Sequence, residues 1–245
     1  MTILVTGGSS GIGRAVAEHW GGRLGHDVVI NYHANDSAAR EAVESVEALG
    51  GRAHLVKADV GTQAGVDALV AAVRDATESL DLFVHCAGLA VTGSALDIDP
   101  ARLAQAIAVN ATSLVPLTQG LLPVLKPGSS LVYISSRGAK SYVPSYVALG
   151  PSKALGEALI RYLAVELAPH GVRANTVAAG ALDTPAFRTM FGERAQDRLD
   201  AAAKANPSGR GLGMADVVAA VEMVSSPGAA MVQGQTLMVD GGISL

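Results

Sequence analysis

A serine, a tyrosine and a lysine in the second half of the chain have the types and spacing of a proton-donating site. Ser136 stands 17 positions before Lys153, and Tyr146 stands seven positions before the same lysine. A phenol has an ordinary pKa of about 10, so it is a poor acid near neutral pH unless a neighbouring cation lowers that pKa. Lys153 can supply this charge, and the Ser136 hydroxyl can donate to a substrate carbonyl. The three residues therefore predict a site that reduces a polar double bond.

A glycine-rich segment near the start of the chain predicts the matching nucleotide site. Gly7, Gly11 and Gly13 follow the apolar run Ile3–Val5 and open a helical pattern. Glycines permit a tight turn that brings backbone N–H groups up to a pyrophosphate, and the helix N-terminus adds a partial positive charge. A strand-to-helix turn can also use one glycine for its geometry alone. We predict that a dinucleotide binds at Thr6, Gly7, Ser9, Ser10, Gly11, Ile12 and Gly13.

Together these features resemble the short-chain dehydrogenase/reductase family. The spacing Thr-Gly-x3-Gly-x-Gly at residues 6–13 is that of the family, and further matches cover nearly the whole chain. The resemblance implies that Asp59 meets the adenine amino group, although this residue could instead only begin a helix. It also implies that Asn110 holds a water through which protons reach the lysine. The other cofactor contacts implied are Val60, Cys86, Ala87, Gly88, Lys153 (on the ribose hydroxyls), Gly180, Leu182 and Thr184.

Two departures from the family pattern limit what can be carried over. His85 and Cys86 replace the usual Asn-Asn, so no asparagine side-chain role is inherited there. We expect Cys86 to be a small buried apolar residue and not a nucleophile. The usual Tyr-x3-Lys is also absent, because Leu149 stands four residues before Lys153 and the motif reads Tyr-x6-Lys. With its flanking residues, this motif resembles the third type of bacterial enoyl-acyl-carrier-protein reductase.

The longer gap indicates which bond is reduced. In a conjugated enoyl thioester the hydride goes to the β-carbon and negative charge appears on a carbonyl oxygen two carbons away, so the acid must stand farther from the nicotinamide than for a ketone. By the resemblance, Tyr146 stabilises this enolate. Tyr142 is a second phenol nearby, which could contact the acyl group or merely pack. One alternative is a carbonyl reductase with an unusual tyrosine placement. Another is a nucleotide-binding regulator that senses redox state. Tyr146 itself could also be a packed loop tyrosine in a protein without catalytic activity.

The choice of dinucleotide depends on the end of the second predicted strand. An acidic residue there would accept hydrogen bonds from the ribose 2′-hydroxyl and repel a 2′-phosphate. The chain instead has Asn31, followed by Tyr32 and His33. The basic residue often found in the glycine loop is missing, since Ser9 and Ser10 stand there. We predict NADPH, with NADH as the alternative.

Alternating strand and helix patterns must position these residues. The predicted strands are Ile3–Val5, Val28–Asn31, Ala53–Val56, Leu82–His85, Ser130–Ile134, Arg173–Val177 and Thr236–Val239. The predicted helices are Ile12–Leu24, Ala38–Leu49, Gln63–Thr77, Pro100–Leu122, Lys153–Ala168 and Ala215–Val224. This alternation predicts an α/β fold, a Rossmann-type doubly wound parallel sheet in one domain over residues 1–245. Because proline is tolerated only in a helix's first turn, the helix bearing Lys153 should begin near Pro151 and leave Tyr146 on the preceding loop.

One region, residues 182–213, interrupts the rhythm. It has no strand pattern, contains several prolines and glycines, and shows helical character only near Arg194–Lys204. A long insertion at the carboxyl end of a strand is where an open α/β sheet places a substrate lid. A surface excursion without a role is the alternative. The basic residues of this segment could meet an acidic acyl carrier protein, although acidic residues among them fit a solvated face equally well.

Composition limits the partners. A net charge of −4 argues against nucleic acid, and no apolar run approaches the roughly 20 residues that span a bilayer. The single cysteine excludes an internal disulfide and fits a reducing cytosol, so we expect a cytoplasmic protein. We expect no metal site. The predicted helices 100–122 and 153–168 carry more apolar surface than a sheet can cover, and the resemblance implies that they pair in a homodimer or homotetramer.

Overall fold

Seven strands form one parallel sheet in the computed structural model, which describes residues 1–245. The strands are β1 (Thr2–Thr6), β2 (Asp27–Tyr32), β3 (Arg52–Lys57), β4 (Leu80–His85), β5 (Leu125–Ser136), β6 (Arg173–Ala179) and β7 (Thr236–Val239). Their order is β3-β2-β1-β4-β5-β6-β7, and every neighbouring pair is parallel. This confirms the predicted doubly wound sheet. The strand order reverses between β1 and β4, and ligands bind at the carboxyl ends of strands flanking such a switch point.

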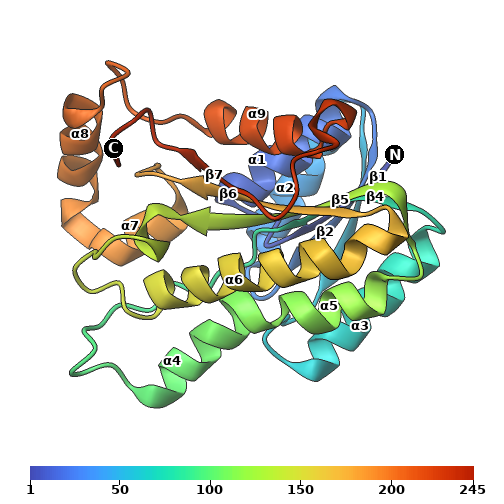
Figure 1. The fold of residues 1–245 in the computed structure, drawn as a ribbon, viewed down its shortest axis with the longest axis horizontal. Helices are drawn as coiled ribbons and strands as arrows, with labels where there is room; N and C mark the ends of the chain where they lie inside the picture. The colour runs from blue at the N-terminus through green and yellow to red at the C-terminus, as the bar shows by residue number, and fades with distance from the viewer.

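Helices cover both faces of the sheet (Figure 1). On one face lie α1 (Gly11–Ala17), its π-helical continuation η1 (Glu18–Arg23), α2 (Asp36–Ala48) and α9 (Met214–Ser225). On the other lie α3 (Gln63–Ala76), α4 (Pro100–Ile107), the π-helical η2 (Ala108–Thr112), α5 (Leu114–Leu121) and α6 (Leu149–Leu167). Two more helices, α7 (Pro185–Phe191) and α8 (Ala195–Ala205), pack at the carboxyl end of the sheet. No helix combines the length and the apolar sequence that a membrane span requires.

The hydrophobic core consists of two layers, one on each face of the sheet. In the first, Leu117 of α5 and Leu163 of α6 pack with Leu131 of β5. In the second, Trp20 of η1 and Val221 of α9 belong to one cluster with apolar residues of the strands, such as Val28 of β2. Because both faces are covered, most strands are continuous apolar runs, which is the pattern the sequence showed. A fully buried leucine contributes about 1.5–3 kcal/mol to such a core, so these layers hold the strand ends firmly in place.

Three local features differ from or refine the sequence prediction. The predicted helix Pro100–Leu122 is broken by η2, a π-helical segment of the kind that often marks a functional site. The segment 182–213 contains α7 as well as the anticipated second helix, because Thr184 caps α7 by accepting a hydrogen bond from the Phe187 N–H. Finally, α6 begins at Leu149, so Pro151 lies in its first turn and Tyr146 lies outside the helix, as predicted.

Candidate active site

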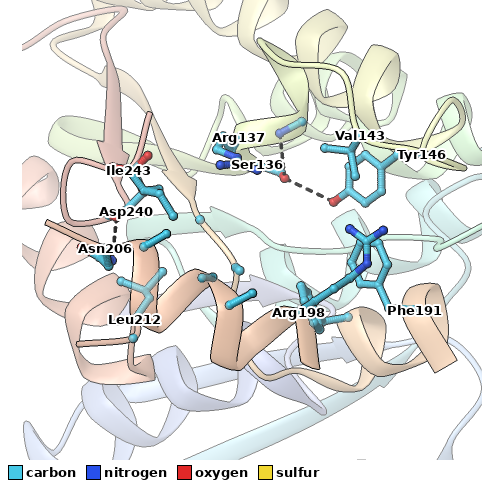
Figure 2. Close-up of a pocket in the computed structure, with 18 residues that line it drawn as sticks. Ser136, Arg137, Val143, Tyr146, Phe191, Arg198, Asn206, Leu212, Asp240 and Ile243 are labelled. Atoms are coloured by element: carbon cyan, nitrogen blue, oxygen red, sulfur yellow. Dashed lines mark hydrogen bonds between the residues drawn. The ribbon is translucent and has the colours of Figure 1, made fainter. Parts of the chain in front are cut away.

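Two hydroxyl groups meet where β5 ends. Ser136 is the last residue of β5, and Tyr146 lies on the loop that leads into α6. Their oxygens are 3.2 Å apart, and the Ser136 Oγ also accepts a hydrogen bond from the Gly138 N–H (Figure 2). Both residues line two adjoining cavities, one over the glycine-rich loop and one beneath α7 and α8. A reactive oxygen at this junction would therefore meet two hydroxyl donors.

The loop before α6 is held in a specific conformation. Ser145 adopts a left-handed backbone with φ of 60°, which costs a residue with a Cβ about 1–2 kcal/mol. Its carbonyl accepts a hydrogen bond from the Gly93 N–H, and the Tyr146 carbonyl accepts from the Gly150 N–H at 2.8 Å. Gly138 leaves room for the phenol, because a Cβ there would lie 2.5 Å from the Tyr146 ring. These contacts place the Tyr146 side chain before the helix begins.

Lys153 is buried on the first turns of α6 and makes no hydrogen bond to Tyr146. Its Nζ donates to the Ile134 carbonyl at 2.8 Å and lies 4.8 Å from the centre of the Tyr133 ring. Burial lowers the pKa of Lys153 to about 8. Burial raises the pKa of Tyr146, opposed only by the hydrogen bond from Ser136. This corrects the expectation that Lys153 lowers the pKa of the phenol: the ammonium points toward a carbonyl and another ring, so Tyr146 stays protonated at neutral pH.

Asn110 lies in η2 and is completely buried. Its Oδ1 accepts from the Leu89 N–H at 2.6 Å, and its Nδ2 donates to the Leu89 carbonyl and to Ser152 Oγ. Its backbone carbonyl accepts from the Tyr133 hydroxyl at 2.6 Å. These bonds join the loop after β4 to α6 and β5, and the role of Asn110 in holding a relay water stays a prediction.

A cleft of about 550 Å³ lies across the switch point of the sheet, within the size range of small-molecule pockets. Its lining fits a dinucleotide. Gly7 has a φ of +64°, and a Cβ there would lie 2.8 Å from the Ala87 Cα. Only glycine therefore fits this backbone conformation and this close approach to Ala87. The Ser10 side chain makes no capping bond to α1, so its hydroxyl is available to a phosphate. The predicted cofactor residues that line the cleft are Gly7, Ser9, Ser10, Gly11, Ile12, Asn31, Tyr32, His33, Asp59, Val60, Cys86, Ala87, Gly88, Lys153, Gly180, Leu182 and Thr184.

Two predicted cofactor residues, Thr6 and Gly13, are not among the residues that line this cleft. The Thr6 Oγ1 accepts from the N–H groups of Cys86 and Ala87, both at 3.2 Å. Gly13 is buried against the backbone of Gly7, where any side chain would collide. Both residues therefore act on the side of the loop that faces away from the cleft. Thr6 ties the loop to the end of β4, and Gly13 lets the loop and α1 pack closely together.

His85, which replaces a family asparagine, links the loop to η2. Ser113 Oγ donates to the Val109 carbonyl at 3.0 Å, so it accepts from the His85 Nε2 at 2.9 Å. The His85 Nδ1 then accepts from the Thr6 hydroxyl at 2.8 Å. Burial, with a smaller effect of the Lys153 charge, lowers the pKa of His85 to about 3, so the ring is neutral. The sequence marked this substitution but not the role of the imidazole.

The adenosine end of the cleft has no carboxylate facing the ribose from β2. The Asn31 amide is buried and donates to the Ala58 and Val56 carbonyls, so it bridges β2 and β3. The exposed His33 ring lies 3.8 Å from an Asp59 carboxylate oxygen. The cleft therefore presents one imidazole and no repelling acid from the second strand, an arrangement that admits a 2′-phosphate.

The second cavity, of about 340 Å³, adjoins the Ser136–Tyr146 pair (Figure 2). Phe191 of α7 stacks parallel to the Tyr146 ring at 6.4 Å between centroids, and the Arg198 guanidinium lies 4.4 Å from the Phe191 centroid. Tyr142 is 89% exposed and lines neither cavity, so its expected substrate contact is not supported; the neighbouring Val143 lines the cavity instead. Sequence reasoning missed the phenylalanines, although Phe187 and Phe191 stand one helical turn apart in the predicted lid.

A dinucleotide cleft that ends at two hydroxyl donors and an apolar cavity defines a nicotinamide-dependent oxidoreductase. The structure contains no group of three or more histidine, cysteine or acidic residues that could hold a metal ion. The family model described as enoyl-(acyl carrier protein) reductase matches residues 7–244. The chain therefore belongs to the short-chain dehydrogenase/reductase family, as its motifs suggested.

Individual relatives are similar over most of their length. A 1-cyclohexenylcarbonyl-CoA reductase of Streptomyces collinus is 34% identical, covering 99% of this chain and 86% of that protein. The crystal structure of a short chain dehydrogenase from Burkholderia cenocepacia in complex with NADP has a TM-score of 0.89 at 30% identity, covering 99% of this chain and 97% of that one. The angucycline C-6 ketoreductase LanV with bound NADP has a TM-score of 0.88 at 30% identity, covering 99% and 95%.

Proposed function

We propose that this enzyme uses NADPH to reduce the 2,3 double bond of an enoyl thioester, carried by coenzyme A or an acyl carrier protein, in fatty-acid or polyketide-type metabolism. The observation that carries the proposal is the position of the Tyr146 hydroxyl. It lies on the loop before α6, bonded to Ser136, at the junction of the cofactor cleft and the apolar cavity. The usual tyrosine position is occupied by Leu149, which lines the cofactor cleft and has no proton to donate.

This arrangement suits charge that develops away from the carbon receiving hydride. Bound NADPH would supply the hydride to the β-carbon. The electron pair of the double bond would then join the α-carbon to the carbonyl carbon and displace the carbonyl π pair onto the thioester oxygen. The hydroxyls of Tyr146 and Ser136 would donate hydrogen bonds to that oxygen and stabilise the enolate. Because burial raises the pKa of Tyr146, its phenol remains a neutral donor during this step. A proton from solvent water then adds to the α-carbon, the enolate returns to the carbonyl form, and the saturated thioester leaves.

The surroundings of the second cavity support an acyl substrate. Its walls include Phe187, Phe191 and Leu212 together with alanines of α8, a lining suited to a hydrocarbon group. The family model's description and the Streptomyces collinus reductase, which is named for an enoyl-type CoA thioester, support the same substrate class. We propose that α7 and α8 form the substrate lid, because Phe187 and Phe191 line both cavities.

A carbonyl reductase is the second candidate. Two hydroxyl donors directed at one oxygen also suit a ketone, and the LanV structure is that of a ketoreductase. Placement separates the two chemistries: a ketone needs the acid next to the carbon that receives hydride, where this chain has Leu149. A preference for a β-keto substrate would reverse the order of the proposals.

The test compares crotonyl-CoA with acetoacetyl-CoA, using NADPH deuterated at either face of C4. We expect the enzyme to convert the crotonyl thioester at a kcat/KM at least ten-fold above that for the acetoacetyl thioester. Mass spectrometry should place one deuterium on C3 of a butyryl product. Faster formation of 3-hydroxybutyryl-CoA would refute the enoyl assignment in favour of the second candidate. Inactivity with both, and with longer and cyclic acyl groups, would favour a non-catalytic nucleotide-binding protein.

We also propose self-association through α6. Tyr162 and Val165 on this helix are 70% and 73% exposed, although both are large hydrophobic residues. A second copy of the chain would cover them in a homodimer or homotetramer. Light scattering measures the molar mass of the wild-type protein and of a Val165→Glu variant. The variant should have a smaller oligomeric mass than the wild type, and a monomeric wild-type protein would exclude the proposal.

A further inference from the structure

Tyr133 lies beneath the active-site lysine, at a place that no part of the proposed reaction uses. It belongs to β5 and is completely buried. Its ring centre lies 4.8 Å from the Lys153 Nζ, and its hydroxyl donates to the Asn110 carbonyl at 2.6 Å. One side chain thus contacts both the lysine of α6 and the π-helical segment η2.

The helix above Tyr133 is built to admit this ring. Gly156 lies in the middle of α6, where glycine is less favourable than alanine. A Cβ at Gly156 would overlap the phenol of Tyr133, including its hydroxyl oxygen. Glycine at this position is therefore explained by the space that the ring occupies. The pair indicates that the chain accepts a less stable helix in order to place a large aromatic residue here.

Few of the groups around Lys153 are able to stabilise its ammonium. The His85 ring is neutral, and the thiol of Cys86 has its pKa raised by burial to about 11, so neither carries a charge near neutral pH. On α6 itself, Glu157 accepts a hydrogen bond from Ser135 Oγ at 2.7 Å. Tyr146, with its raised pKa, is also neutral. The Ile134 carbonyl and the face of the Tyr133 ring remain as direct partners of the ammonium.

We propose that Tyr133 is a positioning residue whose ring face holds the Lys153 ammonium at the cofactor cleft, while its hydroxyl anchors η2 through Asn110. A cation above an aromatic ring in a desolvated site is stabilised by about 0.5–2 kcal/mol. The ring therefore keeps the lysine charged and oriented toward the ribose side of the cleft. This inference concerns the cofactor end of the site and does not depend on which thioester or ketone is reduced.

The first test measures the titration of Lys153 directly, without cofactor or substrate. Protein labelled with ¹³C-lysine is titrated between pH 6 and 11 and the Cε resonance of Lys153, assigned with Lys153→Arg, is followed by NMR. The wild-type midpoint should lie near the pKa of about 8. Tyr133→Leu removes the ring and should lower the midpoint by about 0.4–1.5 pH units. Tyr133→Phe keeps the ring face and should leave the midpoint within about 0.2 units.

Cofactor binding gives the second readout. The dissociation constant of NADPH, from its fluorescence at pH 8, should rise about three- to thirty-fold in Tyr133→Leu and less than about two-fold in Tyr133→Phe. Phe83→Leu is the matched control, because Phe83 is a fully buried aromatic residue of β4 that stacks on His85, whereas the ring that the lysine ammonium faces is that of Tyr133. It should lower thermal stability without moving the Lys153 midpoint.

Gly156 provides an independent variant. Gly156→Ala should displace the Tyr133 ring and lower the Lys153 midpoint as Tyr133→Leu does, yet add nothing further in a Tyr133→Leu background. If Tyr133→Leu does not fold, Tyr133→Met fills the same space without a ring face and replaces it. Equal midpoints in the wild-type, leucine and methionine proteins would overturn the proposal. An equal shift in the Phe83→Leu control would also overturn it, because any core vacancy would then have the same effect.

Discussion

The sharpest test of the catalytic reasoning removes one oxygen. Tyr146→Phe deletes the hydroxyl that lies 3.2 Å from Ser136 Oγ and keeps the ring that stacks on Phe191. If this hydroxyl stabilises the oxyanion, kcat should fall about 10²–10³-fold, the usual effect of losing one such donor. Stability should change little, because one hydrogen bond contributes only about 1 kcal/mol, or about 2–4 °C in the melting temperature of a chain of this size.

The assay follows NADPH oxidation with crotonyl-CoA and acetoacetyl-CoA in parallel. NADPH affinity should stay within about two-fold of wild type, because Lys153 is held by Ile134 and not by Tyr146. Tyr142→Phe is the matched control: this phenol is four residues away and 89% exposed, so its loss should leave both activities unchanged. A Tyr146→Phe enzyme with kcat within about three-fold of wild type would refute the role assigned to the hydroxyl.

Three further predictions concern other parts of the site. His33→Ser should weaken NADPH binding about three-fold and leave NADH binding unchanged in a fluorescence titration, since an exposed ion pair contributes up to about 1 kcal/mol; equal losses for both dinucleotides would contradict a 2′-phosphate contact. Burial lowers the pKa of His85 to about 3, so as pH falls below 6.5 this imidazole takes up a proton in the unfolded chain but not in the folded one. Denaturant melts should therefore show that the free energy of unfolding falls by about 2 kcal/mol between pH 6.5 and 5 because of this residue. That share of the slope should disappear in His85→Asn, and an unchanged slope would mean that the ring is not buried neutral. Ser145→Gly should keep activity and match or exceed wild-type stability, whereas Ser145→Val should lose about 1–2 kcal/mol together with activity, because the left-handed backbone before Tyr146 disfavours a β-branched residue; equal melting temperatures for the two variants would contradict this.

Features set by local pattern were open to prediction from the sequence. The apolar runs Ile3–Val5 and Leu82–His85 predicted buried parallel strands, and the glycines after the first run predicted the cofactor loop. The proline at position 151 placed Tyr146 outside α6, and the structure confirms it. Each of these follows from rules that act within a few residues: side-chain periodicity, glycine's backbone freedom and proline's missing N–H.

Contacts between distant segments were decided only by the tertiary structure. The Lys153 ammonium faces the ring of Tyr133 instead of Tyr146, and the side-chain amide of Asn110 is hydrogen-bonded to Leu89 and Ser152. The sequence could not show these pairs, because their members are separated by about 20 to 40 positions and meet only where helices pack on the sheet. Burial then sets their chemistry: the same packing that brings the groups together removes water, lowers the pKa of Lys153 and raises that of Tyr146. Residue types and spacing thus predicted a nicotinamide-dependent oxidoreductase. The partners of each reactive group, by contrast, follow from how the helices pack on the sheet near the carboxyl ends of the strands.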